Sequence, residues 1–397
     1  MNKFSYIVGY KRTPIGSFMG SLSSVEAPRL AASIIKDMIQ DLNIDPSKFG
    51  QVVMGNVLQA GIGQAPARQA AIYSGLPNSV CATTINKVCG SGLQSIVYAD
   101  NQIRLGESSL ILAGGMENMS KVPHYFNNSR VGTKLGNQSI IDGMIHDGLW
   151  DPYSSIHMGS CAEELAESRG YTREIQDSYA SMSYERALKA IDSGLMKDEI
   201  SKVIISDRKN ELVVSSDEEP GKFRPEKISA LRPAFNKEGT ITAANASSIS
   251  DGAACVILSS LDTCDRIRIE PAARIVAHSS IAHEPIKFTT APIEAIKKVL
   301  LLAELTIEDI DLFEINEAFA CVPMVAIDDL GLDINKVNVH GGAIALGHPI
   351  GASGTRILVT LLNSLKHYNR QYGLATLCIG GGEGIAIIVE NLSFENK

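Results

Sequence analysis

Short apolar runs alternate with longer amphipathic segments along most of the chain. The segments FSYIVGY (4–10), QVVMGNVL (51–58) and SSLILAGGM (108–116) predict strands. Between the first two, apolar residues recur at helical spacing over residues 28–42, which predicts an amphipathic helix. Because strands that alternate with helices are typical of βαβ units, the pattern predicts an α/β fold with a largely parallel sheet covered on both faces.

The same order of elements occurs twice. Residues 25–120 run from a helix through an acidic turn, a strand, a glycine-flanked helix start (VCGSGLQSI) and a helix to a strand with glycines (LILAGGMEN). Residues 291–384 repeat this order, with PIGASGTRIL at the helix start and ATLCIGGGEG at the last strand. A duplicated α/β unit explains the repeat. We therefore expect two similar halves, 1–120 (completed by about 246–270) and 271–397.

The stretch between the halves, 121–245, differs from them in composition and in its pattern of apolar residues. It is polar and rich in Asn, Ser and Gly, with one clear predicted helix over residues 173–191. Long irregular insertions in compact proteins are usually functional. We interpret this segment as a loop domain that forms a lid over a site built by the two halves.

Composition excludes several classes of protein. Lys and Arg number 36 against 44 Asp and Glu, and the resulting net charge of −8 is not that of a protein that coats nucleic acid. No apolar run reaches the length of about 18 residues that a membrane-spanning helix needs. The seven cysteines form no CxxC pair and no zinc-like cluster with histidine. Free thiols in a reducing compartment, with the cytoplasm as default, are the expectation.

Cys89 is the first candidate for chemistry. It follows an apolar stretch and precedes Gly90, Gly92 and a helical pattern, so the thiol is expected at a helix N-terminus. There the helix dipole and free N–H groups favour the thiolate and depress the pKa of the thiol. A packed structural thiol at a tight turn is the alternative.

His348 is the second candidate, and His340 is its rival. His348 lies in HGGAIALGHPIGASG among small residues, so its imidazole is expected to project into a cavity as a general base or an oxyanion donor. If His348 must be neutral, activity should fall on the acid side as an imidazole with a pKa near ~6.5 takes up a proton. A satisfied structural histidine is the alternative for both residues.

Three more residues lie at the ends of predicted strands. Cys378 precedes three glycines whose N–H groups can form an oxyanion pocket, and close strand packing is the alternative. Asn316 and Glu317 also end a strand, where side chains of α/β proteins commonly face the site; a helix cap is the alternative. The dinucleotide-binding motif GxGxxG is broken by Pro66, and the hydrolase motif GxSxG is absent.

Taken together, the segments resemble the thiolase family over nearly the whole chain. The matching stretches are NKVCGSG, GGMENMS, IHMGSCAE, LRPAFNKEGTITAANAS, DGAA, NEAFA, GGAIALGHPIGASG and CIGGGEG. The IHMG segment at 156–159 looks like the short-chain, acetoacetyl-CoA branch. The resemblance implies two similar βαβαβαββ halves in a five-layer α-β-α-β-α core with an inserted loop domain.

The resemblance also implies roles for the candidate residues. Cys89 matches the nucleophile that accepts an acyl group from CoA, and His348 matches the base that activates it. Cys378 matches the second thiol, which moves a proton to or from the substrate's α-carbon. Asn316 matches the residue that holds a water which, with His348, stabilises an oxyanion. The backbone amides of Cys89 and Gly380 would form a second oxyanion hole.

Ten positions match residues that line the CoA channel of the family: Leu149, His157, Met158, Leu231, Phe235, Ala243, Ala246, Ser247, Ala318 and Phe319. Lys222 and Arg224 lie where the sequence aligns poorly with the family, so which of them meets a CoA phosphate stays open. Pro220 stands where a potassium-activated mitochondrial branch has Tyr, which argues against activation by a monovalent cation.

The activity that the resemblance implies is reversible condensation of two acetyl-CoA to acetoacetyl-CoA and CoA, by a ping-pong route through acetyl-Cys89. No cofactor or metal beyond the substrate CoA is expected, and no nucleic acid or membrane partner. Family members are dimers that often pair into tetramers, so a homotetramer is expected. The alternatives are a degradative 3-ketoacyl-CoA thiolase of broader specificity and an acyl-CoA-binding homologue without catalysis.

Overall fold

The computed structural model describes residues 4–206 and 210–395 of the chain. One mixed sheet dominates the described part, with strands in the order β14-β15-β16-β13-β1-β12-β5-β3-β4 and β2 beside β12. These strands are β1 (Tyr6–Arg12), β2 (Gly16–Ser17), β3 (Gln51–Gly55), β4 (Cys81–Ile85), β5 (Leu110–Asn118), β12 (Ser250–Ser259), β13 (Ala273–Ala282), β14 (Leu312–Ile315), β15 (Tyr372–Ile379) and β16 (Glu383–Asn391).

The strand order is nearly symmetric about the centre of the sheet. Starting from the centre, β1-β12-β5-β3 on one side corresponds to β13-β16-β15-β14 on the other, and the two series meet at the short β1–β13 pairing. In each series the inner pairings are antiparallel, whereas β5–β3 and β15–β14 are parallel. The internal repeat of the sequence therefore has a structural counterpart in strand order and direction.

The expectation of a largely parallel sheet is wrong. In the described part of the chain, pairing is parallel at β3–β4, β3–β5 and β14–β15 and antiparallel between the other strands of the sheet. The antiparallel pairing of β15 with β16 has a local cause, because the glycines at 380–382 join these two strands as a hairpin. The antiparallel pairing of β12 with β5 joins segments far apart in the sequence, and the alternation of strands and helices along the chain does not reveal it.

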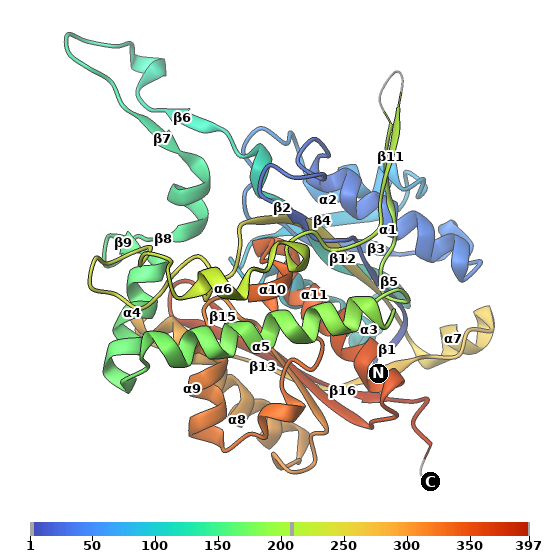
Figure 1. The fold of residues 1–397 in the computed structure, drawn as a ribbon. Helices are drawn as coiled ribbons and strands as arrows, with labels where there is room; N and C mark the ends of the chain where they lie inside the picture. The colour runs from blue at the N-terminus through green and yellow to red at the C-terminus, as the bar shows by residue number, and fades with distance from the viewer. Residues whose placement is uncertain (1–3, 207–209, 396–397) are drawn as a thin grey trace.

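Helices cover the sheet and fill the space between its two halves (Figure 1). Each face of the strands contributes alternate residues to a different buried cluster, as the two-residue period of a strand requires. One cluster lies beneath α1 and α2, a central one around α3 and α11, and a third beneath α8 and α9. The result is an α-β-α-β-α layering. These helices are α1 (Ala27–Asp41), α2 (Pro66–Tyr73), α3 (Ser91–Leu105), α8 (Ala291–Ala303), α9 (Cys321–Leu330) and α11 (Ile350–His367).

The two central helices approach each other through the glycine-flanked helix starts of the repeat. A Cβ on Gly92 would lie 2.8 Å from the Thr355 hydroxyl oxygen, and one on Gly354 would lie 2.5 Å from the Leu93 amide nitrogen. Real Cβ atoms do not approach so closely, so both positions require glycine. Because α3 and α11 begin at this contact, the segments that precede them come from opposite halves and meet at the centre of the molecule.

The segment between the halves supplies the remaining elements. An arm built on β6 (His124–Phe126) and β7 (Ile140–Asp142) extends away from the body in Figure 1. The arm is followed by β8 (Trp150–Asp151), β9 (Ile156–His157), α4 (Met158–Arg169) and α5 (Arg173–Asp192). Helix α5 confirms the helix predicted there, and its N-cap is Thr172, whose hydroxyl accepts a hydrogen bond from the Ile175 amide.

Shorter elements complete the fold. The hairpin of β10 (Val203–Ser206) and β11 (Glu211–Val214) and the short helices α6 (Pro225–Ile228), α7 (Leu261–Ile267) and α10 (Ala343–Leu346) connect the larger elements. Across 4–206 and 210–395, none of the helices combines the length and the apolar character needed to cross a membrane.

Candidate active site

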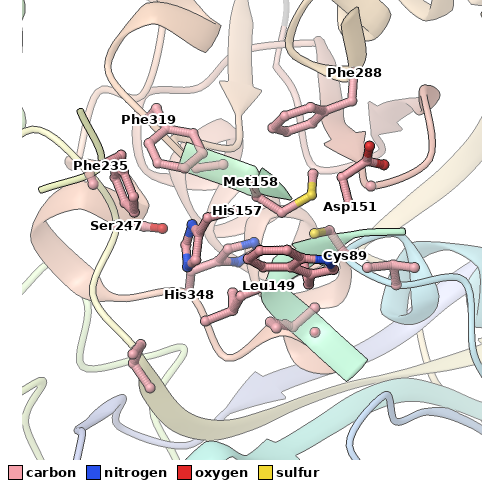
Figure 2. A pocket seen from close by; sticks show the side chains of 18 of the residues that line it. Cys89, Leu149, Asp151, His157, Met158, Phe235, Ser247, Phe288, Phe319 and His348 are labelled. Atoms are coloured by element: carbon pink, nitrogen blue, oxygen red, sulfur yellow. The ribbon is translucent and has the colours of Figure 1, made fainter. Parts of the chain in front are cut away.

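A cavity of about 640 Å³ lies where the two halves and the inserted segment meet. Figure 2 shows side chains around it from all three regions, among them Cys89, Met158 and His348. Its other walls are largely apolar, with the aromatic rings of Phe235, Phe288 and Phe319 as well as Ala and Gly residues. A cavity with apolar walls and few polar groups is typical of a small-molecule site.

A strained turn holds Cys89 at the cavity. Val88 has a φ of 45°, a left-handed value that β-branched residues rarely adopt. The Ser91 hydroxyl accepts a hydrogen bond from the Lys87 amide at 2.8 Å and donates one to the Val88 carbonyl at 2.7 Å, which closes the turn. A Cβ on Gly90 would lie 2.4 Å from Ile379, so only glycine fits behind the thiol. Cys89 is therefore placed by backbone geometry, directly before helix α3.

Two backbone amides point at the Cys89 sulfur. The N–H groups of Gly380 and of Cys89 itself interact with the sulfur and lower the pKa of the thiol. These interactions favour the thiolate, but burial is the larger effect and raises the pKa of Cys89 to about 11. The expectation of a depressed thiol pKa is therefore wrong, because loss of solvation outweighs the helix terminus. The thiol is neutral in the unliganded protein.

His348 lies between α10 and α11, and Ser353 fixes the state of its ring. The Ser353 hydroxyl donates a hydrogen bond to the Pro349 carbonyl at 3.0 Å, so its single proton is already used. The oxygen also lies 2.5 Å from His348 Nδ1, and with the hydroxyl proton directed at Pro349 it is Nδ1 that carries the ring proton and donates it. Nε2 is left with a lone pair, and it has no hydrogen-bond partner in the described protein.

The imidazole of His348 is neutral over the physiological range. Burial, together with the positive charge of Arg356, lowers its pKa to about 3. The expected loss of activity near the ordinary pKa of a histidine therefore does not follow from this structure. A neutral thiol beside a neutral imidazole is a pair in which charge appears only when a proton moves.

Cys378 and Asn316 are buried and are not among the residues that line the cavity. Cys378 is on β15 and is almost fully buried; burial, with smaller contributions from Cys89 and Cys321, raises the pKa of its thiol well above the usual value. Asn316 directly follows β14, and its amide donates a hydrogen bond to the carbonyl of Thr376 on β15. Neither polar atom of its buried carboxamide has a partner within the described residues. Unpartnered buried amides are rare and call for a bound water or ligand.

Glu317 has a different role from its neighbour Asn316. Its carboxylate accepts hydrogen bonds from the hydroxyls of Tyr179 and Ser183, the side chain of Asn338 and the backbone amide of Ile344. These bonds join helix α5 of the inserted segment to the loop that leads to His348. The site interpretation therefore fits Asn316, whereas Glu317 is a structural residue.

Gly380 and its neighbours form the turn between β15 and β16. Gly381 and Gly382 have φ values of 91° and 83°, which favour glycine. Met158 covers Gly380, because a Cβ placed on that glycine would lie 3.4 Å from the Met158 methyl carbon. The thioether therefore limits the space next to the amide that points at Cys89.

The structure brings nine of the twelve predicted CoA contacts to the cavity wall: Leu149, His157, Met158, Phe235, Ala243, Ala246, Ser247, Ala318 and Phe319. The other three predicted contacts, Lys222, Arg224 and Leu231, lie outside the wall of this cavity. For Lys222 and Arg224 the side chains bond to nearby groups, including the Ser17 hydroxyl and the Phe223 carbonyl. Their contact with CoA remains a prediction.

Stacked rings order one wall. His157 packs on Phe235 with ring centroids 4.7 Å apart, and Phe319 meets Phe235 edge to face. The Gly159 amide donates to His157 Nδ1 at 3.1 Å, so the other ring nitrogen carries the proton. A Cβ on Gly159 would lie 2.3 Å from the Phe235 ring, which explains the glycine.

Sequence reasoning missed several residues of the site. Ser353 lies in the quoted segment GHPIGASG, five residues after His348, and its hydroxyl could have been recognised as a possible partner. Glu117 lies in GGMENMS; its buried carboxylate accepts hydrogen bonds from Val57, Leu58 and Gly351 amides and from Asn56. It ties the start of α11 to the other half. Asp151 and Phe288, which line the cavity, carried no recognisable signal.

His340 lies elsewhere. It lines a separate cavity, and its ring nitrogens lie near the hydroxyls of Ser364 and Tyr368. Of the two histidines considered, only His348 reaches the cavity that contains Cys89.

Comparison with known proteins adds independent evidence. The family model described as "Thiolase, N-terminal domain" matches residues 5–262, and "Thiolase, C-terminal domain" matches residues 269–391. An acetyl-CoA acetyltransferase of Yarrowia lipolytica is 48% identical over 389 residues, which cover 98% of this chain and 97% of the relative. A probable acetyl-CoA acyltransferase of Staphylococcus aureus is 49% identical over 380 residues, covering 95% of this chain and 96% of the relative.

Solved structures agree with the architecture. The crystal structure of an acetyl-CoA acetyltransferase from Bacillus anthracis superposes with a TM-score of 0.96 at 39% identity, covering 98% of this chain and 99% of the other. A thiolase from Ascaris suum in complex with coenzyme A gives a TM-score of 0.93 at 41% identity, covering 98% and 100%.

Proposed function

Since this chain belongs to the thiolase family, we propose that it is an acetyl-CoA C-acetyltransferase. The reaction is the reversible Claisen condensation of two acetyl-CoA to acetoacetyl-CoA and CoA. It proceeds by a ping-pong route through acetyl-Cys89. The observation that carries this proposal is the Cys89 sulfur with two backbone N–H groups aimed at it, in the same cavity as the free Nε2 of His348.

In the first half-reaction, His348 Nε2 takes the thiol proton of Cys89 as the sulfur attacks the thioester carbonyl. The developing oxyanion lies next to the sulfur, where the amides of Cys89 and Gly380 donate hydrogen bonds. The CoA thiolate takes the proton of Cys378 as it leaves, and the imidazolium of His348 keeps the proton that came from Cys89. Acetyl-Cys89 remains, and the CoA thiol departs neutral.

In the second half-reaction, a second acetyl-CoA loses an α-proton to Cys378. The enolate oxygen lies between His348 and a water held by the Asn316 carboxamide, whose unpartnered atoms suit that water. The enolate carbon attacks acetyl-Cys89, and the displaced Cys89 sulfur regains its proton from the His348 imidazolium. Because Cys378 is neutral at rest, its proton must leave in the preceding step, so the two thiols act in sequence.

The CoA moiety is proposed to enter through the apolar cavity. Its pantetheine arm would pass the stacked rings of His157 and Phe235, with Ser247 as a hydrogen-bonding group. The segment 121–245 supplies much of this wall, which supports its interpretation as a lid. The phosphates would lie beyond the cavity mouth, towards Lys222 and Arg224. No further cofactor is proposed.

Intact-protein mass spectrometry after brief mixing with acetyl-CoA tests the nucleophile. A gain of one acetyl group that maps to the peptide holding Cys89 is expected. Cys89→Ser should remove both the adduct and turnover but keep CoA binding. The exposed Cys81 gives a matched control, because Cys81→Ser should leave the adduct unchanged. Turnover that persists in Cys89→Ser would refute the proposal, and CoA binding without any adduct in the parent protein would indicate a non-catalytic homologue.

The second candidate is a degradative 3-ketoacyl-CoA thiolase of broader chain length. The name of the Staphylococcus relative, an acyltransferase, is compatible with it. Rates of thiolysis for acetoacetyl-CoA and for a 3-ketoacyl-CoA of eight or more carbons separate the two. Strong preference for acetoacetyl-CoA is expected, because Met158 occupies the space beside Gly380.

Assembly and location are further parts of the proposal. We propose a homotetramer made of two dimers, which the protruding arm supports because its apolar residues Val131 and Leu135 are fully or nearly fully exposed. Light scattering coupled to gel filtration tests this state. We propose the cytoplasm as the compartment and lipid metabolism as the setting, in keeping with free cysteines throughout the described chain. Imaging of a tagged chain tests the location.

A further inference from the structure

A second cavity of about 440 Å³ shares no lining residue with the candidate active site. Helix α5, residues 311–312, the segment 335–340 and the residues after α11 form its walls. Part of the wall is aliphatic, with Ala190, Leu195, Leu312 and Val339. The charged residues of the wall are mostly cationic.

Four cationic side chains line this cavity: Arg186, Lys189, Lys336 and Arg370. None of them forms an ion pair with a carboxylate in the part of the chain that the structure describes. Such a concentration of unpaired positive charge is unusual in a protein whose net charge is −8. Like charges repel one another, so the grouping costs free energy unless an anion compensates for it.

Two of the cations are held in place by the backbone. Arg186 donates hydrogen bonds to the carbonyls of Val337 at 2.7 Å and Ile334 at 3.0 Å, and Lys336 donates to that of Ile310 at 3.2 Å. Side chains fixed in this way lose little entropy when a ligand binds. Their remaining N–H groups are available to an anion.

The one carboxylate of the lining does not neutralise the cluster. Asp311 accepts hydrogen bonds from the backbone amides of Gln371 at 2.9 Å and Tyr372 at 3.0 Å, which orient it towards the start of β15. Four cations therefore stand against a single acid whose carboxylate already serves the backbone.

His340 is the buried polar group of the cavity, with 1% of its surface exposed. Its nitrogens lie 3.2 Å from the Ser364 hydroxyl and 3.3 Å from the Tyr368 hydroxyl. Burial is the main cause that lowers the pKa of His340 to about 4, so the ring is neutral.

We propose that this cavity is a second ligand site, which binds a small polyanionic molecule carrying a pyrophosphate or two phosphate groups. Arginine and lysine are the residues that bind phosphates, through charge-assisted hydrogen bonds. The aliphatic wall and the exposed Tyr368 ring would contact the ligand's organic part.

Isothermal titration calorimetry of the full chain with inorganic pyrophosphate, in phosphate-free buffer without divalent metal, tests the proposal. Saturable binding with a micromolar Kd is expected for the parent protein. Lys189→Glu combined with Arg370→Glu should raise Kd by about tenfold or more, since two charge-assisted contacts become repulsive. Both residues are exposed, and an unchanged melting temperature without pyrophosphate verifies folding.

Two double variants with the same change in net charge serve as controls. Lys36→Glu with Lys297→Glu alters α1 and α8, which do not line the cavity, and should leave Kd within about twofold. Lys222→Glu with Arg224→Glu alters the proposed CoA-phosphate region and should also leave it within about twofold. Absence of saturable binding, equal weakening in all three double variants, or weakening only in the Lys222 and Arg224 pair would each overturn the proposal. None of these outcomes depends on acetyl transfer, so the proposed enzyme activity is tested separately.

Discussion

Removal of the Ser353 hydroxyl should impair the catalytic base without changing any residue of the cavity wall. In Ser353→Ala, His348 Nδ1 loses its partner at 2.5 Å and becomes a buried, unpaired N–H. The constraint on the tautomer is lost as well. A proton that moves to Nε2 would present an N–H to Cys89 where a lone pair is needed.

The size of the effect follows from the charge that develops. When Nε2 accepts the thiol proton, the ring becomes an imidazolium and its Nδ1–H bond to Ser353 becomes charge-assisted. Hydrogen bonds to charged groups contribute about 1.5–3 kcal/mol. Since each 1.36 kcal/mol is a factor of ten in rate, acylation of Cys89 should slow by about 10- to 150-fold.

Rapid-quench mass spectrometry of acetyl-Cys89 measures that step directly. Ser364→Ala is the matched control, because Ser364 is a buried hydroxyl on the same helix, 3.2 Å from the ring of His340. Both variants delete a serine hydroxyl that contacts a histidine. Only Ser353→Ala should reduce the acylation rate beyond about threefold, whereas both should lose a similar free energy of unfolding of about 1 kcal/mol.

Two results would refute this reasoning. An acylation rate in Ser353→Ala within about threefold of the parent would show that the hydroxyl does not position the base. Equal slowing in both serine variants would show that helix α11 is merely destabilised. Unchanged CoA affinity in Ser353→Ala would confirm that the loss lies in chemistry and not in binding.

Three further predictions concern the site. Because burial lowers the pKa of His348 to about 3, the imidazole stays neutral as pH falls through the ordinary histidine range, and acylation should be flat from about pH 8 to about pH 5; a limb near 6.5 would contradict it. Glu117→Gln should lower the free energy of unfolding by about 2–4 kcal/mol, because the NH₂ group of the new amide must face two N–H donors. Denaturant titration measures this loss, and an unchanged unfolding midpoint would refute the prediction. Met158→Ala should raise kcat/KM for a six-carbon 3-ketoacyl-CoA relative to acetoacetyl-CoA by about tenfold. An unchanged ratio would show that the Met158 side chain does not limit the length of the acyl chain.

The sequence predicts the duplication because the repeated helix starts carry their own physical reason. Gly92 and Gly354 are needed where α3 and α11 touch, and glycines of this kind are visible in a sequence. Strand direction is not visible in the same way. The pairing of β5 with β12 joins residues more than a hundred positions apart, and no local pattern encodes such a contact.

The candidate nucleophile and base were predictable because their surroundings are unusual. Cys89 and His348 lie among glycines and other small residues, whose short side chains leave room for a substrate beside the thiol and the imidazole. The electrostatics were not predictable, since the pKa of Cys89 depends mainly on burial in the folded protein, which the residues around it in the sequence do not reveal. The hydrogen bonds of Glu117 were not predictable either, since its partners come from two segments distant in sequence, 56–58 and Gly351.

Neutrality of the resting site has a consequence for catalysis. A preformed thiolate and imidazolium would be solvated poorly in this cavity and would expose a reactive sulfur to oxidants. With both groups neutral, the ion pair forms only as the thioester carbonyl becomes an oxyanion, and the amides of Cys89 and Gly380 then stabilise that oxygen. The amides contribute most at the transition state, which is where stabilisation accelerates a reaction. The burial that raises the pKa of the thiol therefore makes the reactivity of Cys89 depend on bound substrate.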